Sequence, residues 1–148
     1  MENEISVLET YLREISRIIN LFTKNHLNKK GLTMSRFWVL NKLSLDNPIT
    51  MSQLQKELLL SPGTLTGLID NLVEDNLVKR WRDDNDRRLV FLLLTDKGYN
   101  LLEEILHYRT TLLSNIPAEK NIDITLLNNN LKEILSVLKA AHHDYEGE

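Results

Sequence analysis

The segment formed by residues 50–98 constrains the fold more than any other part of the chain. It begins with two short helical patterns separated by a few residues, and two apolar runs follow, at 77–82 and 89–94. A charged loop, 83–88, joins the two runs, which predicts a β-hairpin with an extended loop. The order of these elements predicts a winged helix-turn-helix, in which a helix N-terminus and a basic loop tip face the same side.

Capping signals mark both helices of the pair. Thr50 and Gln53 match a capping box, in which the two side chains satisfy backbone amides at a helix start. Ser61 and Pro62 match the N-cap and the first position of the next helix, since proline lacks only an amide that has no partner there. Asn76 stands where that helix should end, because asparagine tolerates the left-handed conformation of a helix terminus.

Two amphipathic helices are predicted before this segment. Apolar residues recur at helical spacing up to Gly31, namely Ile5, Leu8, Leu12, Ile15, Ile18, Ile19 and Phe22. Thr33 can cap a second helix, which is expected to stop in the turn-rich segment 46–48. The apolar residues of this second helix are Phe37, Trp38, Leu40 and Leu43.

Two leucine-rich helices are predicted after the segment. Thr95 and Asp96 cap a fifth helix that is expected to run to Pro117, and a sixth helix follows. Their apolar residues are Leu101, Leu102, Ile105, Leu106, Leu112, Leu113 and Ile116, then Leu127, Leu131, Ile134, Leu135 and Leu138. One small module cannot cover such stripes at both ends of the chain, so we expect them to pack against a second copy in a homodimer.

Composition excludes several classes of protein. A chain of 148 residues fits one domain that needs no disulfide or structural metal. With no cysteine, thiol catalysis, cysteine zinc sites and thiol redox sensing are excluded. No apolar run approaches the roughly 20 residues that span a bilayer, and the first residues lack the features of a signal peptide. We therefore expect a cytoplasmic protein without membrane contact.

Charge restricts any nucleic-acid contact to one part of the chain. The net charge of −3 argues against a protein that binds nucleic acid non-specifically over its whole surface. Basic residues do cluster in one short stretch, where acidic residues partly offset them. The basic ones are Lys79, Arg80, Arg82, Arg87, Arg88 and Lys97, and the acidic ones are Asp83, Asp84, Asp86 and Asp96. From charge alone, a solvated hairpin is the alternative interpretation.

Several motifs in this order resemble the multiple-antibiotic-resistance regulator (MarR) family of bacterial transcription factors. They are Ser61-Pro62-Gly63-Thr64-Leu65-Thr66, the run at 72–80, Asp86-Arg87-Arg88 and Leu94-Thr95-Asp96-Lys97-Gly98. The resemblance covers essentially the whole chain. It implies a mainly α (α+β) fold, a winged helix-turn-helix with about six helices and a small antiparallel β-wing, in one domain spanning 1–148. Within it, 1–30 and 99–148 would form the dimerisation region and 31–98 the DNA-binding module.

The resemblance also implies a function for these parts. Family members are dimers that occlude promoters, so we expect a repressor that binds double-stranded DNA at a pseudo-palindromic operator, with major-groove contacts about 34 Å apart. By similarity, Arg88 would reach the minor groove and Asp86 would orient its guanidinium. A surface ion pair worth about 0–1 kcal/mol is the alternative for these two residues.

Other DNA contacts are expected at the start of the fourth helix and around it. Ser61, Pro62, Gly63, Thr64 and Thr66 lie where a helix N-terminus favours phosphate and hydroxyls can touch base edges. Ser61 could instead serve only as a cap, and Thr66 could bond backward to a carbonyl. Phosphate contacts are expected from Arg36, Lys56, Lys79 and Arg87, with a solvated side chain as the alternative for each.

The fourth helix departs from the family pattern. Many relatives carry basic residues where this chain has Gly67 and Asn71, so the helix contains no Lys or Arg. Bidentate arginine readout of guanine from this helix is therefore excluded. Hydroxyls, thymine-methyl contacts and shape readout by the wing remain, which predicts modest affinity with a steep dependence on the wing.

A small aromatic or phenolic effector is a further implication of the resemblance. Its binding site would consist of Tyr11, Phe22, Phe37, Trp38, Tyr108 and Arg109, although aromatic residues at helical spacing are also typical of a core. No cofactor and no metal site are expected. His107 is interpreted as a structural or surface residue and His26 as a helix-end residue. His142-His143-Asp144 is interpreted as part of a frayed terminus, with metal binding as the alternative.

Two other functions compete with DNA-binding regulation. A winged helix that binds proteins and has lost DNA binding is favoured by the acidic net charge and the uncharged fourth helix. An enzyme has little support, because the sequence shows no nucleophile elbow, glycine-rich phosphate loop or His-Glu-x-x-His pattern.

Overall fold

The computed structural model describes the backbone of residues 1–146 and the side chains of residues 1–144. The chain divides into two compact units, the first being Met1–Arg109 and the second beginning at Thr110. No helix in the described part is long and apolar enough to cross a membrane.

The first unit opens with α1 (Glu2–Lys29), the long helix predicted from the N-terminal stripe. It ends as predicted just before Gly31, whose φ of 68° is a conformation that glycine adopts without steric cost. Only Thr23 and Leu27, both near the end of α1, are buried. Most of the apolar stripe of this helix is therefore exposed.

The next helix, α2 (Met34–Leu40), is shorter than predicted. Its start is confirmed, since the Thr33 hydroxyl accepts a hydrogen bond from the Arg36 amide at 3.2 Å. The prediction that it runs to 46–48 is wrong. After Leu40 the backbone no longer follows the α-helical pattern of bonds four residues apart. The amide of Leu43 donates to the carbonyl of Leu40, three residues back. This turn still buries Leu43, which explains why the apolar pattern extends past the helix.

The helix-turn-helix pair consists of α3 (Met51–Leu58) and α4 (Pro62–Glu74), and its predicted caps are confirmed. In the capping box, the Thr50 amide donates to Gln53 Oε1 at 2.9 Å and the Gln53 amide donates to Thr50 Oγ1 at 3.1 Å. Asn76 follows α4 with φ of 59°, the left-handed conformation expected there. Leu59, in the turn between the helices, also has a positive φ of 53°, which its side chain does not favour.

A three-stranded antiparallel sheet completes the module. The strands β2 (Val78–Arg82) and β3 (Val90–Leu94) form the predicted hairpin, with Arg82 opposite Val90 as its last pair. The third strand, β1 (Ile49–Thr50), lies on the other edge of β3. It was not predicted, because two residues are too few to show the alternating pattern of a strand.

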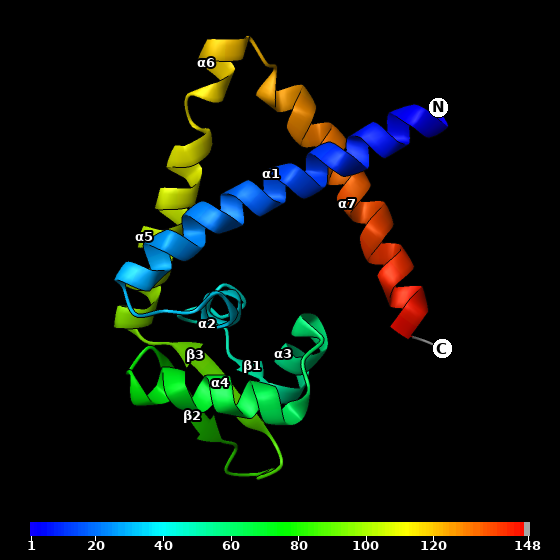
Figure 1. Cartoon of the computed structure of the whole chain (residues 1–148). Coiled ribbons are helices and arrows are strands. Elements are labelled where there is room, and N and C mark those ends of the chain that lie inside the picture. The colour runs from blue at the N-terminus through cyan, green and yellow to red at the C-terminus, as the bar shows by residue number, and fades with distance from the viewer. Residues whose placement is uncertain (147–148) are drawn as a thin grey trace. The chain divides into compact units, whose positions relative to one another are not determined.

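The core of this module lies between α4, α2 and the sheet. Among its fully buried side chains are Phe37, Leu40, Leu54, Leu65, Ile69, Leu72, Leu92 and Ile105. In Figure 1, α4 and the loop between β2 and β3 lie at the end of the first unit away from α1. A mainly α winged helix-turn-helix, as predicted, thus presents one helix and one loop on the same side.

Gly98 positions the helix that follows the sheet, α5 (Asp96–Leu113). The Thr95 hydroxyl caps this helix by accepting from the Gly98 amide at 3.0 Å. A Cβ atom on Gly98 would overlap the backbone carbonyl of Leu77. Only glycine therefore allows α5 to start directly against the chain that enters β2.

The second unit contains the end of α5, the short helix α6 (Ile116–Lys120) and α7 (Ile124–Glu146). The prediction that the fifth helix runs to Pro117 is wrong. That helix ends at Leu113, and Pro117 lies in the first turn of α6, where its missing amide needs no partner. Among the described side chains of α7 none is buried, including those of its leucine stripe.

Candidate nucleic-acid interface

The start of α4 presents an exposed group of hydroxyls. Ser61 accepts a hydrogen bond from the Thr64 amide at 3.2 Å, and its own hydroxyl donates to Thr64 Oγ1 at 2.8 Å. Pro62 and Gly63 lie between them and are exposed as well. The structure therefore brings these four predicted residues together at a helix N-terminus, where the helix dipole favours anions.

Thr66, one turn later on α4, forms the backward bond that was the alternative to DNA contact. Its hydroxyl donates to the Pro62 carbonyl at 2.8 Å. Thr66 is an exposed residue, and its hydroxyl oxygen keeps a lone pair with which to accept a hydrogen bond. The bond to the Pro62 carbonyl therefore does not prevent the Thr66 hydroxyl from also accepting a hydrogen bond from DNA.

The middle of α4 carries no positive charge of its own. Gly67 and Asn71 are exposed, and a Cβ atom added to Gly67 would meet open space. Asp70, on the same helix, binds the guanidinium of Arg80 from β2. This ion pair ties the base of the wing to α4 and brings a basic residue beside the uncharged helix.

The loop between β2 and β3, residues 83–89, carries the predicted wing pair. Arg88 Nε donates to Asp86 Oδ1 at 2.9 Å, and Arg88 Nη2 donates to Oδ2 at 3.0 Å. The Arg88 side chain is nevertheless 90% exposed. The hydrogen bonds from the Arg88 side chain, and next from its amide, hold the pKa of Asp86 below its usual range. The Arg88 guanidinium is thus held by Asp86 while it remains exposed at the surface of the wing.

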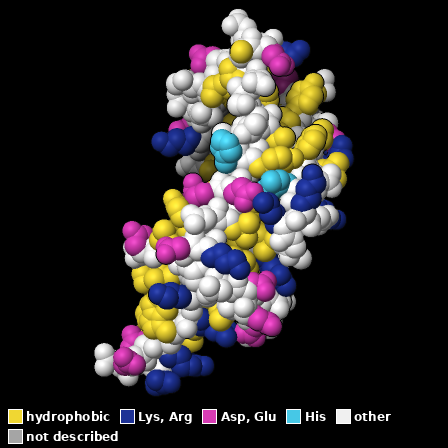
Figure 2. Space-filling model, turned by 90° about the vertical axis from the view of Figure 1, so that its left-hand side faces the viewer, with side chains coloured by type: hydrophobic (Ala, Val, Ile, Leu, Met, Phe, Trp, Pro, Cys, Tyr) yellow, Lys and Arg dark blue, Asp and Glu magenta, His cyan; other side chains and the backbone are white. Residues whose placement is uncertain are grey.

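The remaining predicted phosphate contacts differ in their surroundings. Lys56, Lys79 and Arg87 are exposed. Arg36 is not: its side chain is 21% exposed and lies 3.5 Å from Asp75, at the end of α4. Figure 2 shows Lys and Arg side chains at the wing end of the first unit with Asp and Glu beside them. Positive charge at this end is therefore local and mixed, as the sequence indicates.

An open cavity of about 650 Å³ lies at the base of the wing. Its lining residues come from α3, α4 and both strands of the hairpin: Met51, Thr66, Arg80, Trp81, Arg82 and Val90. Trp81 stacks on Phe91, its cross-strand partner, with ring centroids 5.8 Å apart. Sequence reasoning missed this cavity, because no spacing rule relates the hairpin to the middle of α4.

Three of the six predicted effector residues, Phe37, Trp38 and Arg109, form a cluster. The guanidinium carbon of Arg109 lies 5.7 Å from the centroid of the Phe37 ring and 5.5 Å from that of Trp38. Arg109 Nη1 donates to Thr23 Oγ1 at 2.6 Å and to Asn20 Oδ1 at 3.3 Å. Burial lowers the pKa of Arg109. Thr23 and Asn20 were not predicted, since polar residues on an amphipathic helix give no sign of an inward contact.

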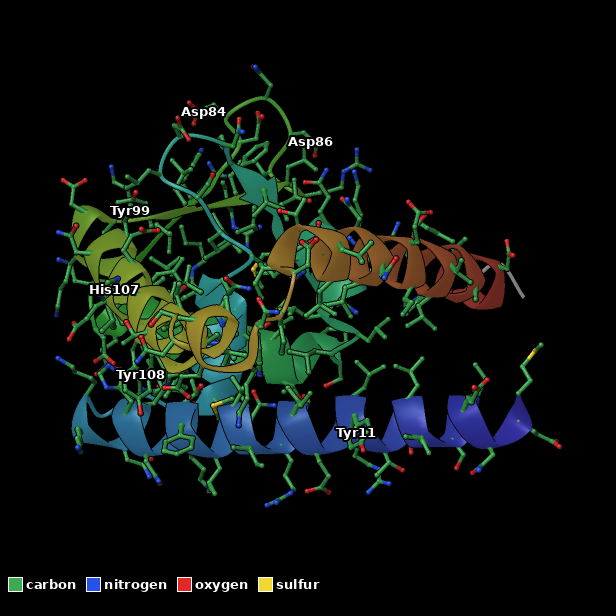
Figure 3. All side chains as sticks on the ribbon, turned by 90° about the horizontal axis from the view of Figure 1, so that it is seen from above. Tyr11, Asp84, Asp86, Tyr99, His107 and Tyr108 are labelled. Atoms are coloured by element: carbon green, nitrogen blue, oxygen red, sulfur yellow. The ribbon has the colours of Figure 1, made fainter. Side chains whose placement is uncertain are left out.

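The other predicted effector residues lie outside this cluster. Tyr108 stacks on His26 with ring centroids 4.2 Å apart, so its ring faces the end of α1. Phe22 is exposed on α1, and Tyr11 lies farther along that helix, well away from Tyr108 (Figure 3). Within residues 1–144, no group of three or more His, Asp or Glu side chains is arranged to hold a metal ion.

Comparison with known proteins agrees with this geometry. The MarR family model matches residues 32–90. The chain is similar to the HTH-type transcriptional regulator MgrA of Staphylococcus aureus, with 29% identity over 91% of this chain and 87% of that protein. It is 34% identical to the HTH-type transcriptional regulator MhqR of Bacillus subtilis, over 60% of this chain and 61% of that protein.

A solved structure extends the likeness to nearly the full chain. It is that of a MarR family protein from Bacillus stearothermophilus, with a TM-score of 0.82 and 26% identity over 94% of this chain and 98% of that one. The family model covers the helix-turn-helix and most of the wing, and the solved structure covers the terminal helices as well. Residues 32–90 thus match the MarR family model, and nearly the whole chain has the fold of a MarR family protein, a winged helix-turn-helix.

Proposed function

We propose that this regulator acts as a homodimeric repressor that binds a pseudo-palindromic operator in double-stranded DNA. The observation that carries the proposal is the exposed Arg88 guanidinium, which Asp86 holds in a bidentate ion pair at the wing. A guanidinium fixed before binding loses less conformational entropy when it enters a narrow minor groove, where negative potential is concentrated.

In this proposal α4 enters the major groove with its N-terminus. Ser61, Gly63 and Thr64 are exposed there, so that Ser61 and Thr64 present hydroxyls and Gly63 its backbone amide to phosphates and base edges. Because Gly67 and Asn71 replace basic residues on the exposed face of α4, little affinity comes from this helix. Discrimination then rests on hydroxyls, thymine methyls and the shape of the minor groove read by the wing.

The exposed apolar stripes of α1 and α7 support the dimer. Ile15 on α1 is 54% exposed and Leu135 on α7 is 52% exposed, and each belongs to a longer series of exposed apolar residues. Patches of this length on a regulator are typical of an interface, and a two-fold axis is its simplest closure. Such a dimer would place its two α4 helices in successive major grooves about 34 Å apart.

Selection of bound sequences from a random duplex pool tests the proposal, run at two salt concentrations. The unaltered chain should enrich a two-fold symmetric motif, and Arg88→Ala should lose it. Arg13→Ala is the matched control, because Arg13 forms a similar exposed bidentate pair with Glu9 on α1. No enrichment at low salt would overturn DNA-specific function and favour a protein-binding winged helix. Equal loss in both variants would overturn the role of the wing.

The proposal extends to a small aromatic or phenolic anion as effector at Arg109. The two hydrogen-bond acceptors that hold its guanidinium, from Thr23 and Asn20, are neutral, and Phe37 and Trp38 lie beside it. A carboxylate or phenolate with an aromatic ring would match this combination of charge and apolar surface. To change DNA affinity, the anion must bind one arrangement of the dimer better than another.

Calorimetric titration with benzoate tests the effector site. The unaltered chain should bind benzoate, and Arg109→Met should lose binding, because methionine keeps much of the volume but no charge. A thermal unfolding curve of the variant checks that the fold is retained. Benzoate binding that is equal in both proteins would place any anion site elsewhere.

A further inference from the structure

The wing loop is closed at its base by the ladder of the hairpin. Arg82 and Val90 form the last strand pair. One step further, the Asp83 amide donates to the Leu89 carbonyl at 3.0 Å. Beyond this point the strands no longer pair, and the backbone bond from Leu89 to Asp86 leaves the peptide unit of Arg88 without a backbone partner, so side chains must orient that unit.

The first half of the loop is organised by the Asp83 carboxylate. Asp83 Oδ1 accepts from the amide of Asn85 at 2.7 Å and from the amide of Asp86 at 3.1 Å. This is the pattern of an Asx-turn, in which a short side chain replaces a backbone acceptor. It fixes the backbone of Asp86, whose carboxylate in turn holds Arg88.

In the second half of the loop, the Leu89 amide donates to the Asp86 carbonyl at 3.0 Å, and side chains hold the peptide unit that joins Arg87 to Arg88. Its carbonyl oxygen accepts from Arg82 Nη1 at 2.7 Å. Its N–H, which belongs to Arg88, donates to Asp86 Oδ1 at 3.1 Å. Because a peptide unit is planar, holding both ends fixes its orientation and therefore the direction in which the Arg88 side chain leaves the backbone.

We propose that Arg82 and Asp83 are positioning residues, which hold the wing in the conformation that presents the Arg88 guanidinium and do not themselves contact DNA. The inference rests on the proposed function, because it assigns these residues to the same wing. It gives Arg82 a role different from the phosphate contacts expected of Lys79 and Arg87. Its guanidinium acts on a backbone carbonyl of the protein, whereas a phosphate contact would act on DNA.

Hydrogen exchange in the free protein gives the first test, measured by NMR at the Arg88 amide. Without Arg82 the peptide unit is held at one end only, so Arg82→Ala should speed exchange of this amide by about tenfold. Asp83→Ala should do the same for the amides of Asn85 and Asp86. Asp83→Asn is the conservative variant, because its side-chain oxygen still accepts these bonds, and exchange should stay near that of the unaltered chain.

A double-mutant cycle on DNA gives the second test, with a duplex recovered from the random-pool selection. Arg82→Ala should weaken binding about tenfold when Arg88 is present, and hardly at all when Arg88 is already alanine. The slope of log affinity against log salt should stay unchanged. If Arg82 instead touches a phosphate, its effect will persist without Arg88, and the slope will fall by about 0.9 for each phosphate that the variant no longer neutralises.

The outcomes separate this inference from the proposed function. If Arg88→Ala leaves DNA binding unchanged, the proposed role of the wing fails and the positioning role fails with it. If Arg88→Ala abolishes binding while Arg82→Ala and Asp83→Ala change neither exchange nor affinity, only the positioning role is overturned. Additive effects of the Arg82 and Arg88 substitutions would likewise overturn it, in favour of a direct contact by Arg82.

Discussion

The winged-helix module and the terminal helices use similar apolar patterns with opposite results. In the module, Leu54, Leu65, Ile69 and Leu72 are fully buried. In α1 and α7, stripes with the same helical spacing lie largely on the surface. An apolar stripe therefore shows that a face must be covered, but not what covers it. In the module one copy of the chain suffices, and for the terminal helices we propose a second copy.

Energetics make the same distinction. Full burial of a leucine side chain stabilises a fold by about 1.5–3 kcal/mol relative to exposure. The module gains this within one copy, so its stability should respond to changes in its own packing. Exposed stripes gain it only through association, so their substitution should alter assembly first. Substitutions in the two regions should therefore have different readouts.

Gly98→Ala should have the largest effect, and it acts on the winged-helix module. The added Cβ would overlap the Leu77 carbonyl, and neither backbone can move without shifting α5 or β2. We expect a loss of about 3 kcal/mol or more in the free energy of unfolding, measured with urea. A variant as stable as the unaltered chain would show that α5 can move away from the sheet, and would break the contrast between a closed module and open terminal helices.

Leu135→Glu tests the terminal helices. If a second copy covers Leu135, the substitution removes about 2–3 kcal/mol of burial from each copy and should weaken dimerisation about a thousandfold or more, as measured by sedimentation. Ser136→Glu is the control, since Ser136 is exposed on the opposite face of α7 from the leucine stripe. Equal sedimentation of the two variants would contradict the dimer contact.

The sequence predicts the module well because its signals are local. Thr50 with Gln53, and Ser61 with Pro62, each mark a helix start through contacts that span only a few residues. Helix ends were less predictable. Leu43 stays buried in a turn after α2 has ended, so periodicity alone extended the helix too far. Proline often follows the end of a helix, but Pro117 lies at the start of α6.

The candidate site was predictable where adjacent residues act on one another. Asp86 and Arg88 are two positions apart, and the family resemblance together with this short spacing predicted their contact, which the structure shows. The contact from Arg82 to the Arg87 carbonyl was not foreseen, because it depends on how the loop folds back beside the hairpin. Neither was the contact from Thr23 to Arg109, which joins residues from two helices far apart in the chain.

Gly67→Ala sharpens the comparison within the module, because it changes the same residue type as Gly98→Ala at an open position. Alanine costs less conformational entropy than glycine in a helix, and the new Cβ would meet no atom. We expect the free energy of unfolding to rise by about 0.5–1 kcal/mol in the urea experiment. A destabilised variant would show that the bare face of α4 is covered by something other than solvent.

The smallest effect concerns the pH dependence of the wing. Folding lowers the pKa of Asp86, chiefly through the hydrogen bonds from the Arg88 side chain, so the folded state favours the charged carboxylate. The contribution is fully present above the ordinary pKa of an aspartate and is lost as the pH falls through the lowered value. We therefore expect acid to loosen the wing, with no change from this group near neutral pH.

An NMR titration of the Asp86 carboxyl carbon checks this prediction. In the unaltered chain its midpoint should lie below the ordinary value, and in Arg88→Ala it should return toward that value. Glu9 provides the internal control, because the hydrogen bond from Arg13 lowers its pKa on α1 independently of the wing. If the titration midpoint of Asp86 is the same in the unaltered chain and in Arg88→Ala, the ion pair does not persist in solution. The wing would then share with the terminal helices the need for a partner to fix its geometry, and DNA binding would have to order Arg88 at an entropic cost.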